Sequence, residues 1–176
     1  MIRSAITIGC LLLAAFGFYG CNENGSVSGN AGALQLFLTD KPAQLQEVNV
    51  KIAEVEVHET GGAWKSFLQT SRTFDLLKLK NTNELLAVSD LSEGLYTGFR
   101  LLIEEGNVID SEGKRCELKV PSDKIEVPVV FEIEKGALTK VVLDFDAAES
   151  VHIVVSGNTQ RCTLRPVLKP ISVTNS

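Results

Sequence analysis

Short segments in which apolar and polar residues alternate recur along this chain, with turn-forming residues between them. Residues 47–59 and 139–146 show the pattern most clearly. Alternation with a period of two places one set of side chains on each face of a β-strand. No long segment repeats apolar residues at the helical spacing of three and four. The pattern therefore predicts an all-β chain, and it excludes helical bundles and α/β folds.

The alternation predicts an antiparallel β-sandwich of about 8–10 short strands, transthyretin-like or immunoglobulin-like, spanning residues 33–176. A phase slip at Ala53-Glu54 predicts a β-bulge. Pro128 predicts an edge position or a bulge, because proline has no N–H to donate to a neighbouring strand. Residues 74–79 fit either a short strand or a turn of helix. The expected strands are 34–39, 47–59, 64–68, 84–88, 99–104, 107–110, 116–120, 125–133, 139–146, 151–155 and 162–168.

Residues 1–20 have the features of a secretory signal peptide. They carry one positive charge, Arg3, followed by an apolar run to about Phe18. The run is too short for an ordinary transmembrane helix, so we expect cleavage rather than a retained anchor. Residues 21–32 are rich in Gly, Asn and Ser, which predicts a flexible linker.

Cys21 follows the small residue Gly20, and Phe18-Tyr19-Gly20-Cys21 resembles a bacterial lipobox, although aromatic residues stand where aliphatic and small ones are usual. We therefore expect Cys21 to carry lipid, with ordinary cleaved secretion as the alternative. Several acyl chains anchor a protein stably where a single chain binds marginally. Asn22, rather than Asp, follows Cys21, which in Gram-negative lipoproteins implies sorting to the outer membrane.

The net charge is −5, and removal of residues 1–20 makes it one unit more negative. An acidic chain is poorly suited to nucleic-acid backbones, so no nucleic-acid partner is expected. The expected partners are the membrane, through the N-terminal lipid, and an envelope protein or a glycan.

Two cysteines remain after Cys10 and Cys21 are assigned to the N-terminal segment. Cys116 and Cys162 are an even pair in an exported chain, so a disulfide between them is expected, with two unpaired thiols as the alternative. The loop of about 46 residues that it would close implies roughly 4 kcal/mol of stabilisation.

Eight short segments, each different, follow one another in a fixed order. They are residues 36–42 (LFLTDKP), 48–57, 61–64 (GGAW), 74–77 (FDLL), 95–101, 120–122 (VPS), 143–146 (LDFD) and 164–167 (LRPV). This ordered set resembles the bacterial and archaeal lipoprotein domain known as domain of unknown function number 4382. The resemblance implies an exported β-sandwich similar to transthyretin-like and carboxypeptidase-regulatory domains. It implies no established activity.

Candidate chemistry is sparse. Asp144 and Asp146 share a strand face and could hold Ca²⁺ through their oxygens, with Asp40 and Asp75 as neighbours. The competing interpretation, which the alternation favours, is a solvated outer face. Asp40 is expected to cap the turn at Pro42.

Other side chains admit both structural and functional interpretations. Trp64, Tyr96 and Phe99 are assigned to the core rather than to a glycan platform. Glu104 and Glu105 are adjacent in a strand, so they are expected to point to opposite faces. His58 and His152 lack a nucleophile motif and are expected at strand surfaces or edges.

The sequence therefore predicts no enzyme and no cofactor. It predicts a lipid-anchored cell-envelope protein, in the outer membrane, whose β-sandwich serves binding or structural support. The alternatives are a carbohydrate- or protein-binding surface lipoprotein and an envelope hydrolase with an unrecognised site.

Overall fold

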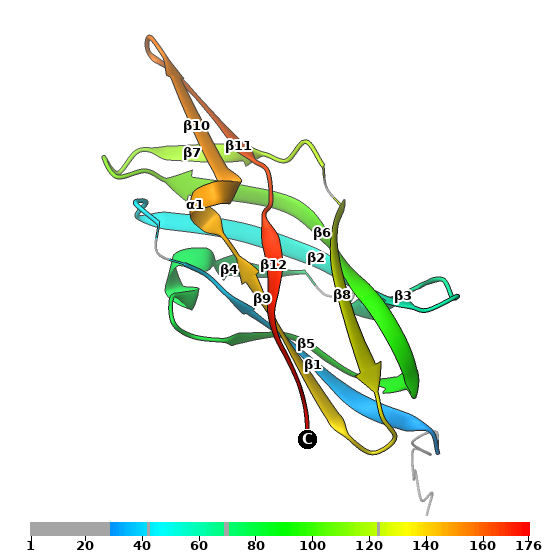
Figure 1. The fold of residues 1–176 in the computed structure, drawn as a ribbon. Helices are drawn as coiled ribbons and strands as arrows, with labels where there is room; N and C mark the ends of the chain where they lie inside the picture. Colours follow the sequence, from blue (N-terminus) through cyan, green and yellow to red (C-terminus); the bar gives the residue numbers. More distant parts are fainter. Residues whose placement is uncertain (1–28, 42, 69–70, 123) are drawn as a thin grey trace, which may run out of the picture.

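The structure is a computed structural model that describes residues 29–41, 43–68, 71–122 and 124–176. Two β-sheets pack face to face, as Figure 1 shows, and confirm the predicted all-β sandwich. The only helical segments in the described residues are single turns, η1 (Leu76–Leu79) and α1 (Ala147–Ser150). None of the helices described is long and apolar enough to cross a membrane.

The smaller sheet has four strands in the order β12-β9-β1-β5. Their bounds are β1 Ala31–Thr39, β5 Glu84–Ser92, β9 Leu138–Phe145 and β12 Leu168–Asn175. β1 pairs antiparallel with β5 and parallel with β9. The first strand of the domain therefore lies in the interior of its sheet. Two strand pairs are parallel, β1 with β9 and β7 with β11, and the other strand pairs described are antiparallel.

The larger sheet is organised around two long strands, β2 (Glu47–Glu59) and β6 (Gly94–Ile109). β8 (Lys124–Ile133) pairs with the first half of β6, and β7 (Arg115–Lys119) pairs with its last three residues. β3 (Trp64–Leu68) and β4 (Arg72–Asp75) both pair with β2. The hairpin of β10 (Val151–Ser156) and β11 (Thr159–Leu164) extends the sheet beyond β7.

The core forms where the alternating apolar side chains of the two sheets meet. Leu34, Leu36 and Leu38 of β1 are all fully buried. Between the sheets, the Phe131 ring stacks on both Tyr96 and Phe99, with centroids 5.4 and 5.2 Å apart. The prediction that Tyr96 and Phe99 belong to the core is therefore confirmed, whereas it was wrong for Trp64, which is only partly buried and lies outside the core.

Several local predictions are confirmed. The pairing of β2 with β6 shifts register between Ile52 and Glu54, where the bulge was expected. Pro128 lies on β8, whose pairing with β6 shifts register opposite it. Residues 74–79, which fitted either a short strand or a turn of helix, contain both: β4 ends at Asp75 and the helical turn η1 follows directly.

Other expectations were wrong. Residues 99–104 and 107–110 are one continuous strand, β6, with a shift in register opposite Lys51. At this irregularity Glu104 and Glu105 both reach Lys51 Nζ, at 2.8 and 3.4 Å, so they do not point to opposite faces. The last predicted strand, 162–168, is two strands, because β11 ends at Leu164 and β12 begins at Leu168 in the other sheet.

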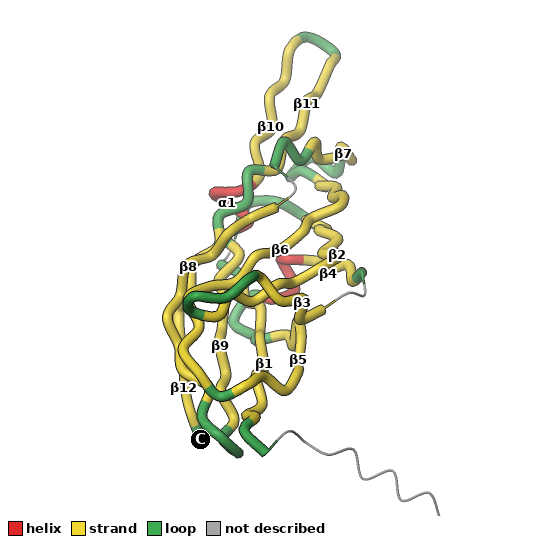
Figure 2. The backbone as a smooth tube through the Cα atoms, turned by 90° about the vertical axis from the view of Figure 1, so that its right-hand side faces the viewer, coloured by secondary structure: helices red, strands yellow, loops and turns green. Residues whose placement is uncertain are grey.

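The domain is elongated, and its two ends differ. β1 begins at one end, near the turn that joins β8 to β9, whereas the β10–β11 hairpin projects from the opposite end (Figures 1 and 2). Ala31 O accepts a hydrogen bond from Gly136 N in that turn at 2.9 Å. We call the hairpin end the distal end, since it lies farthest from the point where β1 enters the domain.

Candidate functional site

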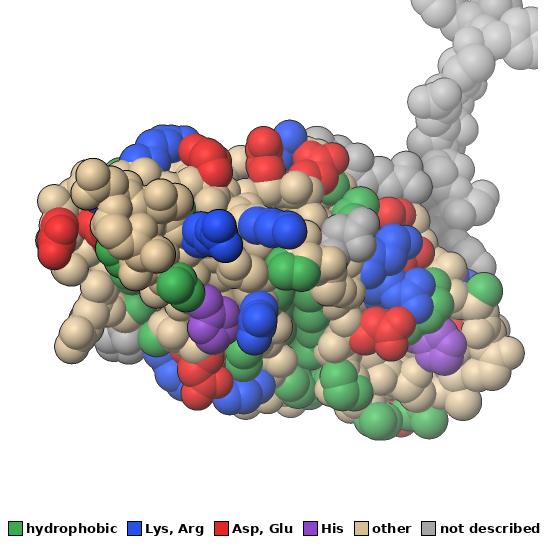
Figure 3. Space-filling view, turned by 90° about the horizontal axis from the view of Figure 1, so that it is seen from above, with side chains coloured by type: hydrophobic (Ala, Val, Ile, Leu, Met, Phe, Trp, Pro, Cys, Tyr) green, Lys and Arg blue, Asp and Glu red, His purple; other side chains and the backbone are tan. Residues whose placement is uncertain are grey.

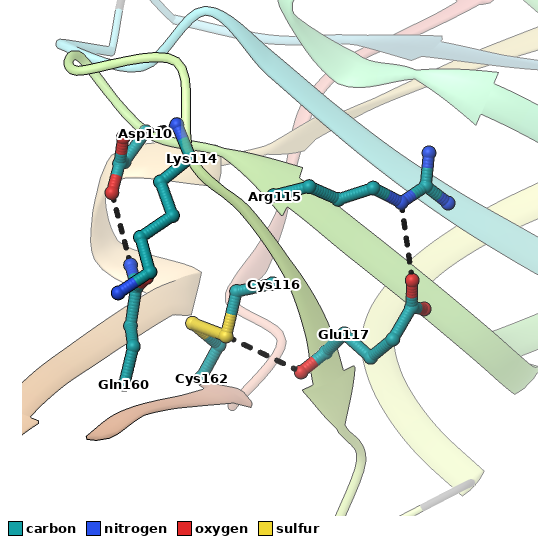
Figure 4. The surroundings of a disulfide bond; sticks show 7 residues. All are labelled: Asp110, Lys114, Arg115, Cys116, Glu117, Gln160 and Cys162. Atoms are coloured by element: carbon teal, nitrogen blue, oxygen red, sulfur yellow. Dashed lines mark hydrogen bonds and ion pairs between the residues drawn. A yellow bond between two sulfur atoms is a disulfide. The ribbon is translucent and has the colours of Figure 1, made fainter. Parts of the chain in front are cut away.

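The disulfide between Cys116 and Cys162 lies at the distal end. Its Sγ atoms are bonded and its Cα atoms are 6.1 Å apart, so the predicted pairing is confirmed. The bond joins β7 to β11, two strands that otherwise pair only at Leu118 with Cys162 and at Lys119 with Thr163. It therefore fastens the projecting hairpin to the body of the larger sheet (Figure 4).

An open cleft with a volume of about 620 Å³ lies over this disulfide, between β7 and β11. We call it the distal cleft. Its residues are Lys114, Arg115, Cys116, Glu117 and Lys119 on one side and residues 158–163 on the other. Figure 3, which looks onto this end, shows lysine and arginine side chains side by side near the hairpin.

A second contact closes the cleft at one end. The Gln160 amide donates a hydrogen bond to Asp110 Oδ2 at 3.0 Å, from β11 to the turn after β6 (Figure 4). The Lys114 backbone N–H, the Gln160 amide and the Glu112 backbone N–H all donate to Asp110, and together they hold the pKa of its carboxyl below the ordinary value. The wall of the cleft is therefore fixed by a covalent bond and by a hydrogen-bonded carboxylate.

The electrostatic character of the cleft opposes that of the whole chain. Four cationic residues, Lys114, Arg115, Lys119 and Arg161, line the cleft with Glu117, which pairs with Arg115 at 3.2 Å. The Asp110 carboxylate at the closed end adds a second negative charge and interacts with Lys114. Within the described residues no ion pair engages Lys114, Lys119 or Arg161. A basic surface on an acidic protein is suited to an anionic ligand.

The predicted carboxylate cluster lies elsewhere, and it is buried. The exposed fractions of Asp144 and Asp146 are 3% and 5%, so the expected solvated face was wrong. Asp40 joins them, whereas Asp75 does not: it caps η1 by accepting from Leu77 N and pairs with Lys78. Asp40 Oδ1 accepts from Ala147 N at 2.9 Å, so it caps the segment after β9, and Pro42, where a turn was expected, lies outside the described residues.

The cation that faces this cluster is Lys41. Its Nζ lies 3.0 Å from Asp144 Oδ2 and 3.5 Å from Asp146 Oδ2. In the described part of the chain, no three His, Cys, Asp or Glu side chains are placed to hold a metal ion. The Lys41 ammonium group therefore lies beside the two carboxylates, where a bound cation would otherwise balance their charge. Calcium binding by Asp144 and Asp146 stays a prediction from the sequence.

A third polar site lies on the outer face of the larger sheet. His58 Nδ1 lies 2.7 Å from Thr97 Oγ1, and both line a pocket of about 280 Å³ together with Trp64. The Arg100 guanidinium lies over the Trp64 ring at 4.0 Å, and the His58 ring is 4.9 Å from it. Because these two groups pack on the indole, the ring is not a free platform for sugar stacking.

The structure thus brings together one predicted pair, Cys116 with Cys162, and one predicted cluster, Asp144 with Asp146. Cys21 lies outside the described residues. The cations of the distal cleft were missed by sequence reasoning. The signal was present, because Lys114, Arg115 and Arg161 stand within two residues of the two cysteines, and the predicted disulfide would bring them together.

Comparison with known proteins gives one match. The family model described as Domain of unknown function (DUF4382) matches residues 31–166, from the first residue of β1 to just beyond β11. No curated protein and no solved structure matches the chain. The match covers both cysteines, the distal cleft and the buried carboxylates, and it ends before β12.

Proposed function

Because the chain belongs to the DUF4382 family, whose description carries no activity, we propose a function from the sequence and the geometry together. The protein is a lipid-anchored component of the cell envelope, attached to the outer membrane through Cys21. Its β-sandwich is a non-catalytic module that binds a ligand at the distal cleft.

One observation supports this proposal most directly: the attachment side and the cleft lie at opposite ends of the domain. β1 enters at one end, and the hairpin and cleft occupy the other (Figure 2). An anchor preceding β1 would therefore hold the domain with its cleft away from the membrane surface. A flexible stretch between Cys21 and β1 would add reach.

The anchor itself is inferred from sequence. Cys21 follows an apolar run and Gly20, and Asn22 follows it. A cysteine with a diacylglyceryl group and an N-acyl group carries three chains, which suffices for stable anchoring.

Substitution of Cys21 tests the anchor. In cells that express the full-length protein, we expect the wild type in the membrane fraction and Cys21→Ser in the soluble envelope fraction. Radiolabelled palmitate should enter the wild type but not Cys21→Ser. Cys10→Ser is the matched control, since Cys10 lies in the apolar run and its loss should change neither result. Membrane recovery of Cys21→Ser equal to that of the wild type would contradict the anchor.

The His58–Thr97 contact favours one alternative from a different class, an envelope hydrolase. A hydroxyl within hydrogen-bond reach of an imidazole is the first element of a nucleophilic site. Among the described residues no carboxylate hydrogen-bonds the His58 ring to orient it. Turnover of chromogenic esters or glycosides by the full-length protein, abolished by Thr97→Val and retained by Thr174→Val at an exposed position on β12, would establish the hydrolase.

A further inference from the structure

The distal cleft is bounded on both sides by strand edges that other strands leave open. β7 pairs with β6 along one edge, and its other edge meets β11 only at Leu118 and Lys119. The edge at Arg115–Glu117 therefore has no partner strand in the described structure. An open edge of this kind is a template on which another chain can add a strand.

We propose that the distal cleft binds an extended acidic segment of a partner protein, which adds as a strand along β7 at Arg115–Glu117. This inference rests on the proposed function, since it names the ligand class of the same cleft. Main-chain hydrogen bonds to the open edge supply affinity in this mode of recognition, and alternate side chains supply specificity.

The charge of the cleft selects an acidic segment. Along β7, Arg115, Glu117 and Lys119 share one face with Thr163 of β11, because Lys119 and Thr163 are register partners. Arg161 stands two residues before Thr163 and lies on that face too. An added strand would place every second side chain toward these cations, and carboxylates there would form charge-assisted hydrogen bonds.

The opposite face of the added strand meets a different surface. Cys116 and Leu118 of β7 and Cys162 of β11 point inward, where Leu118 and Cys162 are buried. Small apolar side chains suit this side of the cleft, over the disulfide. The expected ligand therefore alternates Glu or Asp with residues such as Val.

A peptide explains the cleft better than an acidic glycan does. Its residues include no aromatic ring on which a sugar could stack. Cations alone would serve either ligand, but the open β7 edge offers backbone groups that only a peptide backbone can complement in register.

The test measures fluorescence anisotropy of a labelled eight-residue peptide that alternates Glu and Val, titrated with the full-length protein in a non-ionic detergent. We expect saturable binding that weakens as NaCl is raised. A Lys-Val peptide of the same length and opposite charge should not bind. Two further probes carry N-methyl groups on one or the other alternate set of residues. At least one of them should bind ten times more weakly, since N-methylation removes donors to the strand edge.

Charge reversals locate the site. Arg161→Glu and Lys119→Glu should each weaken binding of the Glu-Val peptide at least tenfold. Lys135→Glu is the matched control: it changes the charge equally in the turn between β8 and β9, at the other end of the domain, and should stay within twofold of the wild type. Circular dichroism confirms that each variant is folded. Lys119 and Arg161 are both exposed and lie on different strands. If one of the two variants fails to fold, the other still tests the site.

Three outcomes would overturn the inference. They are no binding of the Glu-Val peptide, equal binding of the peptide and both N-methylated probes, and binding of polygalacturonate in place of the peptide. The last would mean recognition of an acidic glycan. None of them bears on the anchor, which the distribution of Cys21→Ser tests separately.

Discussion

The carboxylate of Asp40 accepts a hydrogen bond from the backbone N–H of Ala147 at 2.9 Å, across 107 positions of sequence. The bond joins the residue after β1 to the first residue of α1, which follows the parallel neighbour β9. Asp40 is only 4% exposed, and its burial raises the pKa of the carboxyl to about 6, with Asp144 and Asp146 adding to the shift. The capping bond is thus made by a carboxylate that pays a desolvation cost when ionised.

Asp40→Asn should stabilise the protein at neutral pH and lose this advantage in acid. Because the folded pKa of about 6 lies above the unfolded value of 3.8, ionisation of Asp40 destabilises the wild type as the pH rises from about 4 to about 6, and the penalty stays constant above that. The amide keeps an oxygen to accept from Ala147 and carries no charge. Its advantage in the free energy of unfolding should grow by up to about 3 kcal/mol between pH 4 and pH 7.

Urea unfolding of the wild type and Asp40→Asn across that pH range measures the difference. Asp90→Asn, at an exposed position on β5, controls for the general effect of removing a carboxylate. A difference that is independent of pH would contradict the raised pKa.

Lys41→Ala should destabilise the fold although the lysine itself is more than half exposed. Its removal leaves Asp144 and Asp146 buried without the cation that faces them. We expect the thermal midpoint to fall by about 2–4 °C or more. Lys135→Ala should leave it unchanged. If Asp144→Asn combined with Lys41→Ala restored none of the loss, the pairing would not be its cause.

Removal of the disulfide should cost about 4 kcal/mol, because the bond closes a loop with a sequence separation of 46. Cys116→Ser with Cys162→Ser should lower the urea midpoint, and reduction of the wild type should reproduce the shift. Reduction should leave the double variant unaffected. The double variant should also bind the Glu-Val peptide more weakly, since the hairpin is no longer fastened to β7.

Tyr96→Phe should cost about 1 kcal/mol, because it removes only the hydroxyl that donates to Ser92 O at 2.9 Å. Tyr96→Ala also removes the ring that stacks on Phe131 and should cost about 3–5 kcal/mol. Equal losses in chemical denaturation would mean that the hydroxyl, rather than the ring, carries the stabilisation.

The strands could be predicted where a single face is buried. In β2, Val48, Val50 and Ile52 alternate with polar residues, and the phase slip located the irregularity with β6. Pro166 lies between β11 and β12 and signals a break, but nothing local shows that the chain changes sheet there, so 162–168 was predicted as one strand. Which sheet a strand joins depends on long-range pairing, and here Leu168 pairs with Phe145.

The candidate sites show the same limit. Alternation placed Asp144 and Asp146 on one face correctly, but it could not show that Lys41 and the α1 segment cover that face. Burial by segments outside the sheet leaves no periodic trace in the sequence. The cleft cations differ, since the cysteine pairing alone was enough to bring Arg115 and Arg161 near each other.

The interior position of β1 has a mechanical consequence. β9 runs parallel to β1 from Ala33 to Thr39, and β5 lines its other side. A pull applied between the N-terminal side of β1 and the distal hairpin would load these hydrogen bonds together, in shear along the strands, rather than one at a time. Force spectroscopy should therefore find that the domain resists extension along its long axis more strongly than traction across the open edge of β12.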